Sequence, residues 1–444
     1  MTAAAAEWAA RIRADGVSEL WVTYHDYIGR PQAKLVPAER FEAAMTAGVS
    51  FAKANLDFNV LDQQAPDFVF GAETGDFLAV PDPEAYARIP HRPGAARAYS
   101  HLHLASGGVW AGCPRSALAA TAATYAQRGL SVRAAFEPEC YLFVRRGDGY
   151  APADTSPMFG PAGLERHHGV IAVLTTSLRD MGVVLEQVGT EYGPGQYEIN
   201  IRHQPPVKAA DDLMTVKEVL RTLAAEAQLV ASFMPKPYTN LPGCGVHVHL
   251  GLNDADGRNL LEGDGPVGLS RLGTAFVAGL LRHARALCGL AAPTVNSYKR
   301  LQPASWAPAH VCYGASNRAA LVRVPDAGTR HVEFRAGDGT GNPYLVLNGL
   351  LAAGLHGIEE GLDPGAPVMD DVGHVGSEQA ALRGVVLLPR SAPEALADLE
   401  ADSVMMDALG PVIGPTFLRV KRSEAATHAL EVSDWERRAY LEWS

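Results

Sequence analysis

The sequence predicts an α+β fold with two domains, an N-terminal domain of residues 1–108 and a larger domain of residues 109–444. Three observations support this prediction. Stretches with the two-residue period of strands alternate with stretches of helical period along the chain. The 44 glycines and 30 prolines indicate many turns between these stretches. A chain of 444 residues, 47% of them hydrophobic, can bury the cores of two domains.

The N-terminal domain begins with an alanine-rich segment, residues 1–16. Its interspersed charges rule out a signal-peptide core and indicate an amphipathic helix. Two strands then flank a turn at Gly29, and a proline- and glycine-marked stretch at residues 90–112 ends this α+β segment. The predicted elements after the first helix are the strands 19–23 and 32–36, the helix 37–47 and the strand 77–81.

The second domain opens with an amphipathic helix, residues 117–129, that stops at a glycine. Five strand candidates and four further helices follow, and two or three helices are expected near the end of the chain. The strand candidates are 131–143, 183–189, 196–202, 245–252 and 331–336. The helix candidates are 162–181, 210–233, 268–290 and 343–361, and the last helical region is 393–443.

Composition argues against several classes of function. The net charge of −11 disfavours a nucleic acid or an anionic membrane as partner, because both require a basic surface. The five cysteines are widely separated and form no CxxC pair, which favours a reducing, cytoplasmic environment over a disulfide framework. The apolar stretch 272–292 is interrupted by Arg282, His283 and Arg285, too early for a membrane span.

Four strand candidates carry pairs of functional side chains two residues apart, which places both members of each pair on one face. The pairs are Glu137 with Glu139, Gln196 with Glu198, His247 with His249, and Glu333 with Arg335. The solvated face of an antiparallel sheet shows the same alternation, so a single pair decides nothing. Glu191 precedes Glu198 across a turn rich in glycine, and that turn can bring both carboxylates to one place.

Taken together, these pairs predict a site for divalent cations. If the strands form one sheet, five carboxylates and two imidazoles converge, and that much buried negative charge needs cations to neutralise it. Mostly oxygen ligands with one or two histidines suit magnesium or manganese rather than zinc or an iron–sulfur cluster.

Several arginines extend this prediction, since a guanidinium binds carboxylate or phosphate through two parallel hydrogen bonds. They are Arg300, Arg318, Arg323, Arg330 and Arg335. Each one alone is explained equally well by a surface salt bridge. Carboxylates, divalent ions and arginines in one place indicate phosphoryl transfer or phosphate binding.

Glycines before the histidine pair allow a close approach of the backbone to a ligand. Gly243 and Gly245 flank Cys244 just ahead of His247, although a Gly-x-Gly pattern also occurs in ordinary turns. Neither a Walker A motif nor a dinucleotide fingerprint occurs, so a nucleotide would be bound in another way.

The motifs, in their order along nearly the whole chain, resemble those of the glutamine synthetase family. Residues 136–139 are similar to its G-x-E-P-E-F strand and residues 191–198 to its E-V-A-x-x-G-Q-x-E segment. Further matching segments are 233–237 with 243–249, 317–325, 333–335 with 342–345, and the loop 296–308. The Trp-Ala-Pro form of that loop is similar to that of γ-glutamylmethylamide synthetases in the type III-like branch.

The resemblance implies a β-grasp N-terminal domain and a catalytic domain built on an incomplete antiparallel β-barrel. It also implies ring-shaped homo-oligomers such as dodecamers, with active sites shared between neighbouring subunits. It further implies ATP and two or more Mg²⁺ or Mn²⁺ ions per site. Carried over by position, Glu139, Glu191 and Glu198 would hold one ion. Glu137, His247 and Glu333 would hold the other.

The resemblance also assigns the binding of glutamate. Arg300 would bind the α-carboxylate, with Gly243 beside it, and Arg335 would bind the γ-carboxyl end. The implied reaction transfers the γ-phosphoryl group of ATP to the glutamate side chain, and a nitrogen nucleophile then attacks γ-glutamyl phosphate.

The nucleotide would lie on the other side of the ions. Arg318 and Arg323 would face the ATP phosphates, with His249 and Arg330 near the nucleotide. Arg318, Arg335 and Trp306 are expected to take part in the reaction itself.

Two positions depart from the family pattern. Trp306 stands where the family has a glutamate that helps remove a proton from ammonia. Ala52 stands where an aspartate from the neighbouring subunit assists ammonium binding. An alanine and an indole leave room for an apolar or cationic amine, which the indole face can contact. The alternative is that Trp306 only packs within its loop.

The leading interpretation is an ATP-dependent ligase that joins glutamate to a small amine other than ammonia. The second is a true glutamine synthetase with a rearranged ammonium site. The third is a non-catalytic relative that uses the fold for binding or assembly. The intact acidic and arginine set argues against the third, because an inactive scaffold does not need costly buried charge.

Overall fold

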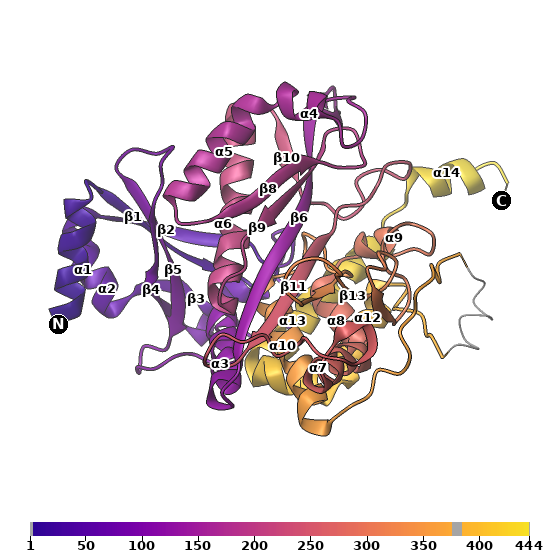
Figure 1. The fold of residues 1–444 in the computed structure, drawn as a ribbon. Helices are drawn as coiled ribbons and strands as arrows, with labels where there is room; N and C mark the ends of the chain where they lie inside the picture. Colours follow the sequence, from indigo (N-terminus) through magenta and orange to yellow (C-terminus); the bar gives the residue numbers. More distant parts are fainter. Residues whose placement is uncertain (1–2, 375–383, 444) are drawn as a thin grey trace.

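The structure, a computed structural model, describes residues 3–374 and 384–443. It confirms the α+β class, since two β-sheets are combined with packed helices (Figure 1). The smaller sheet lies on the N-terminal side of the molecule in Figure 1, and the larger sheet lies beside helices of the C-terminal half. Among the described residues, no helix is both long enough and apolar enough to cross a membrane.

Five strands form the N-terminal sheet, in the order β2-β1-β5-β4-β3. Their bounds are β1 Glu19–His25, β2 Pro31–Pro37, β3 Val49–Ala52, β4 Asp76–Arg88 and β5 Ala95–His103. All neighbours are antiparallel except β1 and β5, which run parallel. Helices α1, Ala3–Ala14, and α2, Phe41–Ala47, contact each other, and α2 also contacts β4. A mixed sheet with parallel first and last strands is the arrangement expected of a β-grasp domain.

The pattern of the sequence misses β5, which falls in the proline- and glycine-marked stretch 90–112. The strand lies in the centre of the sheet, and residues 95–100 are all buried. Three of its nine residues are alanines, which have weak strand preference, so pairing on both edges determines the conformation. The predicted domain division at residues 108 and 109 falls between β5 and α3, Pro114–Gln127. It stays a prediction.

Nine strands form the larger sheet, with the main order β12-β13-β14-β11-β6-β9-β8, while β7 and β10 also pair with β6. The bounds are β6 Ser131–Arg146, β7 Gly149–Pro152, β8 Leu185–Thr190, β9 Gln196–Ile201, β10 Val230–Ser232, β11 Val246–Asn253, β12 Tyr313–Ala315, β13 Val322–Val324 and β14 Val332–Phe334. All pairs are antiparallel except β12 with β13. The sheet is nearly closed like a barrel, which confirms the expected incomplete barrel.

Some helices cover this sheet, and others form a group beside it (Figure 1). Their bounds are α4 Pro161–Arg166, α5 His168–Asp180, α6 Pro206–Glu226, α7 Arg271–Arg282, α8 Ala284–Ala291, α9 Ser297–Arg300, α10 Pro343–Glu360, α12 Ala392–Ala401, α13 Ser403–Ala429 and α14 Asp434–Tyr440. Helix α6 packs on β6 and β10 and also contacts α3, α5 and α10. It is therefore one of the elements that join the sheet to other helices.

The helix predicted for residues 210–233 ends earlier than expected. Helix α6 stops at Glu226, Gln228 adopts a left-handed conformation with φ 59°, and Val230–Ser232 form β10. The Leu229 amide donates to the Ala224 carbonyl and closes the last turn. The predicted helices 162–181 and 268–290 are each divided in two, at His167 and His283.

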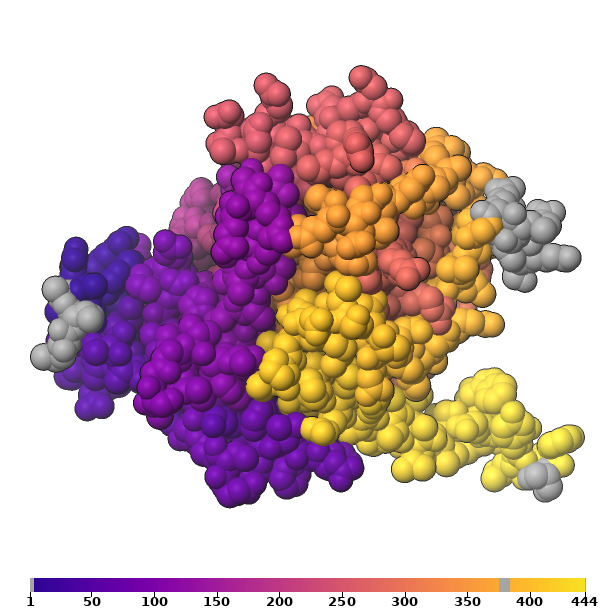
Figure 2. Space-filling model, turned by 90° about the horizontal axis from the view of Figure 1, so that it is seen from below, coloured from indigo at the N-terminus to yellow at the C-terminus, as the bar shows by residue number. Residues whose placement is uncertain are grey.

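Two or three helices were expected in the last region, and three are present there: α12, α13 and α14. The last of them extends as an arm away from the body of the molecule (Figure 2). Large apolar side chains on and around this arm are exposed, and they include Leu430, Trp435, Leu441 and Trp443.

Candidate functional site

The predicted site residues form a row across five strands of the larger sheet. Residues that pair directly on neighbouring strands share a face of the sheet. The pairs are Glu198 of β9 with Glu139 of β6, Glu137 of β6 with His247 of β11, His249 of β11 with Glu333 of β14, and Glu333 with Arg323 of β13. The strands supply these positions because buried apolar residues alternate with them. Along β6, every second residue from Val132 to Cys140 is buried.

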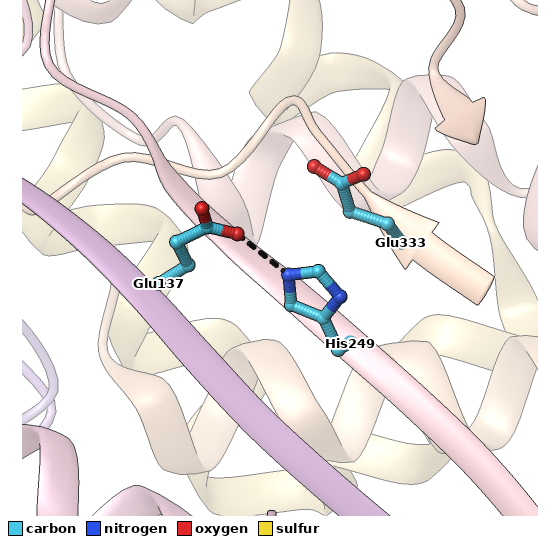
Figure 3. A group of neighbouring side chains, drawn as sticks. All are labelled: Glu137, His249 and Glu333. Atoms are coloured by element: carbon cyan, nitrogen blue, oxygen red, sulfur yellow. Dashed lines mark hydrogen bonds and ion pairs between the residues drawn. The ribbon is translucent and has the colours of Figure 1, made fainter. Parts of the chain in front are cut away.

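Three residues of this row can hold a divalent ion. Atoms of Glu137, His249 and Glu333 lie within 4.8 Å of one another. The side chains converge from three neighbouring strands, and His249 Nε2 lies 2.8 Å from Glu137 Oε2 (Figure 3). Two carboxylates and one imidazole suit magnesium or manganese.

The sequence resemblance assigned His247, rather than His249, to the ion held by Glu137 and Glu333. In the structure His247 contacts two carboxylates: its Nδ1 lies 3.4 Å from Glu333 Oε1 and its Nε2 lies 3.9 Å from Glu139 Oε1. The two histidines are on the same face of β11, so a strand period cannot tell which of them lies nearer an ion. Burial, with the charge of Arg335, lowers the pKa of His247 to about 3, which keeps its imidazole neutral and able to coordinate.

A second group of carboxylates adjoins the first. Burial raises the pKa of Glu139, and burial together with the Glu139 charge raises the pKa of Glu191 to about 7. Burial and the hydrogen bond to Glu137 raise the pKa of Glu198 to about 10. The protein alone therefore cannot keep all these carboxylates ionised, and cations would restore their charge. This need for added positive charge is consistent with the predicted ion held by Glu139, Glu191 and Glu198.

Glu333 links the carboxylates to the arginines. Burial favours its neutral form, but Arg335, His247 and His249 outweigh burial and lower the pKa of Glu333 to about 2. Arg323 Nη1 donates to Glu333 Oε2 at 2.8 Å, and Arg335 donates to the other oxygen. Arg335 Nε also donates to the Arg318 carbonyl, while the Arg318 side chain is exposed at the edge of the site.

The buried Arg300 presents a fixed guanidinium. Its Nη1 donates to the carbonyls of Ala336 and Gly337 at 3.2 and 3.1 Å, and its Nη2 donates to the Arg335 carbonyl at 3.1 Å. Of the five N–H groups of a guanidinium, these bonds leave the Nε–H and one Nη2–H. Those two form the side edge of the guanidinium, the geometry that binds a carboxylate through two parallel bonds.

The glycines before β11 are needed because Arg300 occupies the adjacent space. A Cβ on Gly245 would lie 2.5 Å from Arg300 Nη2, and a Cβ on Gly243 would lie 2.8 Å from Arg300 Cγ. Both distances are too short for any side chain. The Gly-x-Gly pattern thus makes room for the arginine, which the sequence alone did not reveal.

A cavity of about 410 Å³ opens beside Glu137 and His249. Its other lining residues include Asn200, Arg330 and His331. Asn200 Oδ1 and Arg330 Nε are buried there without a hydrogen-bond partner. Both atoms are shielded from solvent, so neither presents a donor or acceptor to a ligand in this arrangement, whereas the volume of the cavity suits a ligand of nucleoside size.

Two residues to which the resemblance assigns no role lie at the site, although the spacing along β9 already pairs the first of them, Gln196, with Glu198. Gln196 Nε2 donates to Glu139 Oε2 at 3.1 Å and to the Gly243 carbonyl at 2.9 Å, which fixes both groups. Asn200 lines the cavity. Both share the face of Glu198 along β9, and the two-residue period of that strand was the available signal.

The two residues expected at the amine end lie apart from this row. Trp306 is 73% exposed in the loop after α9 and has a left-handed φ of 63°. Ala52 is exposed at the end of β3 in the other sheet, where it pairs with Asp76. Ala52 therefore lies on a different sheet from the carboxylate row.

Comparisons with known proteins identify similar sequences and structures over nearly the whole chain. The family model for the glutamine synthetase catalytic domain matches residues 111–440. A glutamate–methylamine ligase of Methyloversatilis universalis is 35% identical over 451 residues, covering 97% of this chain and 98% of the relative. A glutamine synthetase of Halobacterium salinarum is 34% identical over 441 residues, covering 97% and 95%. A solved complex of GmaS with ADP matches with a TM-score of 0.88 at 34% identity, covering 98% and 99%.

Proposed function

The chain belongs to the glutamine synthetase family, and we propose that it is an ATP-dependent ligase that joins glutamate to a small organic amine. In the proposed reaction an oxygen of the glutamate γ-carboxylate bonds to the γ-phosphorus of ATP, and ADP leaves. The amine nitrogen then attacks the side-chain carbonyl carbon of γ-glutamyl phosphate, phosphate leaves that carbon, and the nitrogen loses a proton. The product is a γ-glutamyl amide.

The carboxylate row would hold the divalent ions of this reaction. One ion is assigned to Glu137, Glu333 and a histidine of β11, and another to Glu139, Glu191 and Glu198. Bound Mg²⁺ or Mn²⁺ supplies positive charge that neutralises the transferring phosphoryl group. The raised pKa values of Glu191 and Glu198 support this assignment, because these carboxylates need added positive charge to ionise.

ATP is assigned to the cavity beside Glu137 and His249. Its volume suits a nucleoside, and the polar side chains of Asn200, Arg330 and His331 are among its lining. Arg318 and Arg323 would stabilise the negative charge of the phosphates at the end of the cavity nearest Glu333. A similar protein was solved with ADP, which is compatible with this assignment.

Glutamate is assigned to the space bounded by Arg300, Gly243 and Arg335. The free side edge of the Arg300 guanidinium would bind the α-carboxylate, and Gly243 and Gly245 keep that edge unobstructed. Arg335, held beside Glu333, would bind the γ-carboxyl end and stabilise the charge that develops when the amine attacks.

The single observation that carries the choice of amine is Trp306, exposed in the loop where the family pattern has a carboxylate. An exposed indole can contact a carbon substituent or an alkylammonium, and it cannot accept a proton from ammonium. Ala52 removes the second carboxylate. A relative named glutamate–methylamine ligase and a relative named glutamine synthetase match this chain almost equally well. The choice of amine in the proposal therefore depends on Trp306 and Ala52.

The alternative of a true glutamine synthetase rests on the names of many of the relatives. A non-catalytic scaffold remains the third candidate, and the buried arginines and carboxylates argue against it. Phosphate release measured with glutamate, ATP, Mg²⁺ and a panel of amines that includes ammonia separates the three. A ligase for organic amines gives the highest rate with one of them, a glutamine synthetase with ammonia, and a scaffold with none.

We further propose a homo-oligomeric ring, a dodecamer, in which Ala52 of one subunit completes the amine end of the next. The position of Ala52 in the other sheet supports sharing between subunits. The exposed apolar side chains of the C-terminal arm, among them Leu430, Trp435 and Leu441, also suit contacts with another chain. The cysteines are all free, which suits a reducing compartment, and the reaction is proposed to occur in the cytoplasm.

A further inference from the structure

We infer that Lys217 is a positioning residue for glutamate binding, because it holds the backbone segment that orients Arg300. The inference rests on the proposed function only for the identity of the substrate. Lys217 lies on α6 and is 4% exposed. Burying an ammonium group is costly unless the group has a specific partner.

The partner of Lys217 is a backbone carbonyl in the loop between β14 and α10. Its Nζ donates to the Gly339 carbonyl at 2.8 Å and lies 5.6 Å from the centre of the Phe233 ring. The other charged groups that act on Lys217 are Arg221 and Glu218 of the same helix and Asp338 of the loop. The cation is therefore directed at one short segment, residues 335–339.

Arg300 holds the same segment. Its guanidinium donates hydrogen bonds to the carbonyls of residues 335, 336 and 337, and Lys217 donates one to the carbonyl of residue 339. Asp338 lies between them in the sequence, fully buried, and its charge attracts both cations. Its Oδ1 accepts the Thr340 amide, while its Oδ2 has no hydrogen-bond partner. Two buried cations and one buried anion thus fix five consecutive residues.

The segment packs closely against neighbouring residues at both of its glycines. A Cβ on Gly339 would lie 2.5 Å from Phe233, and a Cβ on Gly337 would lie 2.6 Å from the Val246 carbonyl. Without the Lys217 donor, the Gly339 carbonyl would be buried and unpaired, so the segment would turn to satisfy it. Such a turn would redirect the carbonyls that bind Arg300, and the free edge of its guanidinium would turn with them.

Helix α6 gives Lys217 a fixed base. Thr215 accepts a hydrogen bond from Arg97 of β5 at 2.8 Å, and Asp211 accepts one from Tyr344 of α10 at 2.7 Å. Residues of α6 near Lys217 are thus hydrogen-bonded both to the N-terminal sheet and to helix α10. The lysine consequently fixes the loop to a part of the molecule that does not depend on the substrate.

Lys217→Met tests this inference, since methionine has nearly the length of lysine and no donor. We expect the glutamate KM to rise about tenfold, with the ATP KM changed less than about threefold. The control is Lys208→Met on the same helix, which removes a donor to the Gly182 carbonyl and also an ion pair with the buried Asp212. It is expected to leave both KM values unchanged.

Wild-type kinetics in Lys217→Met, or equal changes in the two KM values, would overturn the inference. If Lys217→Met does not fold, Lys217→Gln decides, since it retains a neutral donor. A glutamate KM above that of the wild type, with the ATP KM unchanged, supports the role, and equal changes in the two KM values contradict it. Failure of the proposed function is recognised separately in the unmodified protein, which would then release phosphate fastest with ammonia or release none.

Discussion

His249 Nε2 lies 2.8 Å from Glu137 Oε2, and the two side chains join strands β11 and β6 at the centre of the carboxylate row (Figure 3). Glu333 lies close enough to both to share an ion with them. The pair thus lies where the candidate metal ligands meet the cavity that Glu137 and His249 line.

Removal of divalent ions should abolish phosphate release. We expect EDTA to stop turnover and Mg²⁺ or Mn²⁺ to restore it, because the carboxylates depend on cations for their charge. Glu139→Ala should lower turnover by about a hundredfold or more, since it removes an assigned ligand. Glu400→Ala, which removes a surface partner of Arg422, is the control. Normal turnover in Glu139→Ala would refute the assignment of this ion.

Arg300→Lys should separate the two substrates. Lysine keeps the charge and loses the two-bond edge, so the glutamate KM should rise about tenfold to a hundredfold while the ATP KM changes little. Gly245→Ala should act in the same direction, since its Cβ would lie 2.5 Å from Arg300 Nη2. Steady-state kinetics with each substrate varied in turn measures both. Equal effects on the two KM values would instead indicate a structural role for Arg300.

Asn200→Ala should produce the opposite pattern. Asn200 lines the cavity assigned to ATP, and shortening its side chain should raise the ATP KM about fivefold to tenfold. The glutamate KM should stay close to that of the wild type. Direct ATP-binding measurements on the same variant provide a second readout. Unaltered ATP affinity would exclude Asn200 from nucleotide binding.

The burial of Lys217 predicts a pH dependence of stability. Burial, together with the charge of Arg221, lowers the pKa of Lys217 from 10.5 in the unfolded chain to about 7. Between these values the unfolded chain binds a proton that the folded protein lacks, so the free energy of unfolding rises with pH. Below about pH 7 the full cost of burying the charge is present.

Lys217→Met lacks this group and should lack the trend. As pH increases from about 7 toward 10.5, the wild type should therefore gain stability relative to the variant. Urea unfolding of both proteins across this range measures the difference. Parallel curves would mean that Lys217 keeps its ordinary pKa in the folded protein.

The sequence predicts the site better than it predicts the N-terminal sheet. Glu137, Glu139, Glu198 and Glu333 lie on strands with clear alternation, so their common face follows from the period of two. β5 is missed because its alanines carry no local signal and its conformation depends on pairing with β1 and β4.

Long-range contacts explain the other omissions. The sequence cannot show that Lys217 reaches Gly339 or that Arg300 fills the space beside Gly245, since each pair is far apart along the chain. For the same reason the local pattern does not distinguish His247 from His249 as the nearer partner of Glu137. Local patterns give the face of a strand, whereas packing decides which atoms meet.

Trp306→Glu should shift the choice of amine toward ammonia. The unmodified protein has no carboxylate at this loop position, and its exposed indole can bury a carbon substituent of the amine. Each buried methylene contributes about 0.8 kcal/mol, and a cation on the ring face contributes about 1 kcal/mol. Together these should favour a small alkylamine over ammonia by about tenfold or more in kcat/KM.

A glutamate at position 306 would remove the apolar contact and supply an acceptor for the ammonium proton. We expect the ratio of kcat/KM for methylamine to that for ammonia to fall, even if both rates decrease. Trp306→Phe, which keeps an aromatic face, is the matched control and should retain the preference for the alkylamine. The decisive comparison is made on the unmodified protein. If it forms glutamine from ammonia faster than it couples any amine of a broad panel, Trp306 does not select an organic amine, and the glutamine synthetase alternative holds.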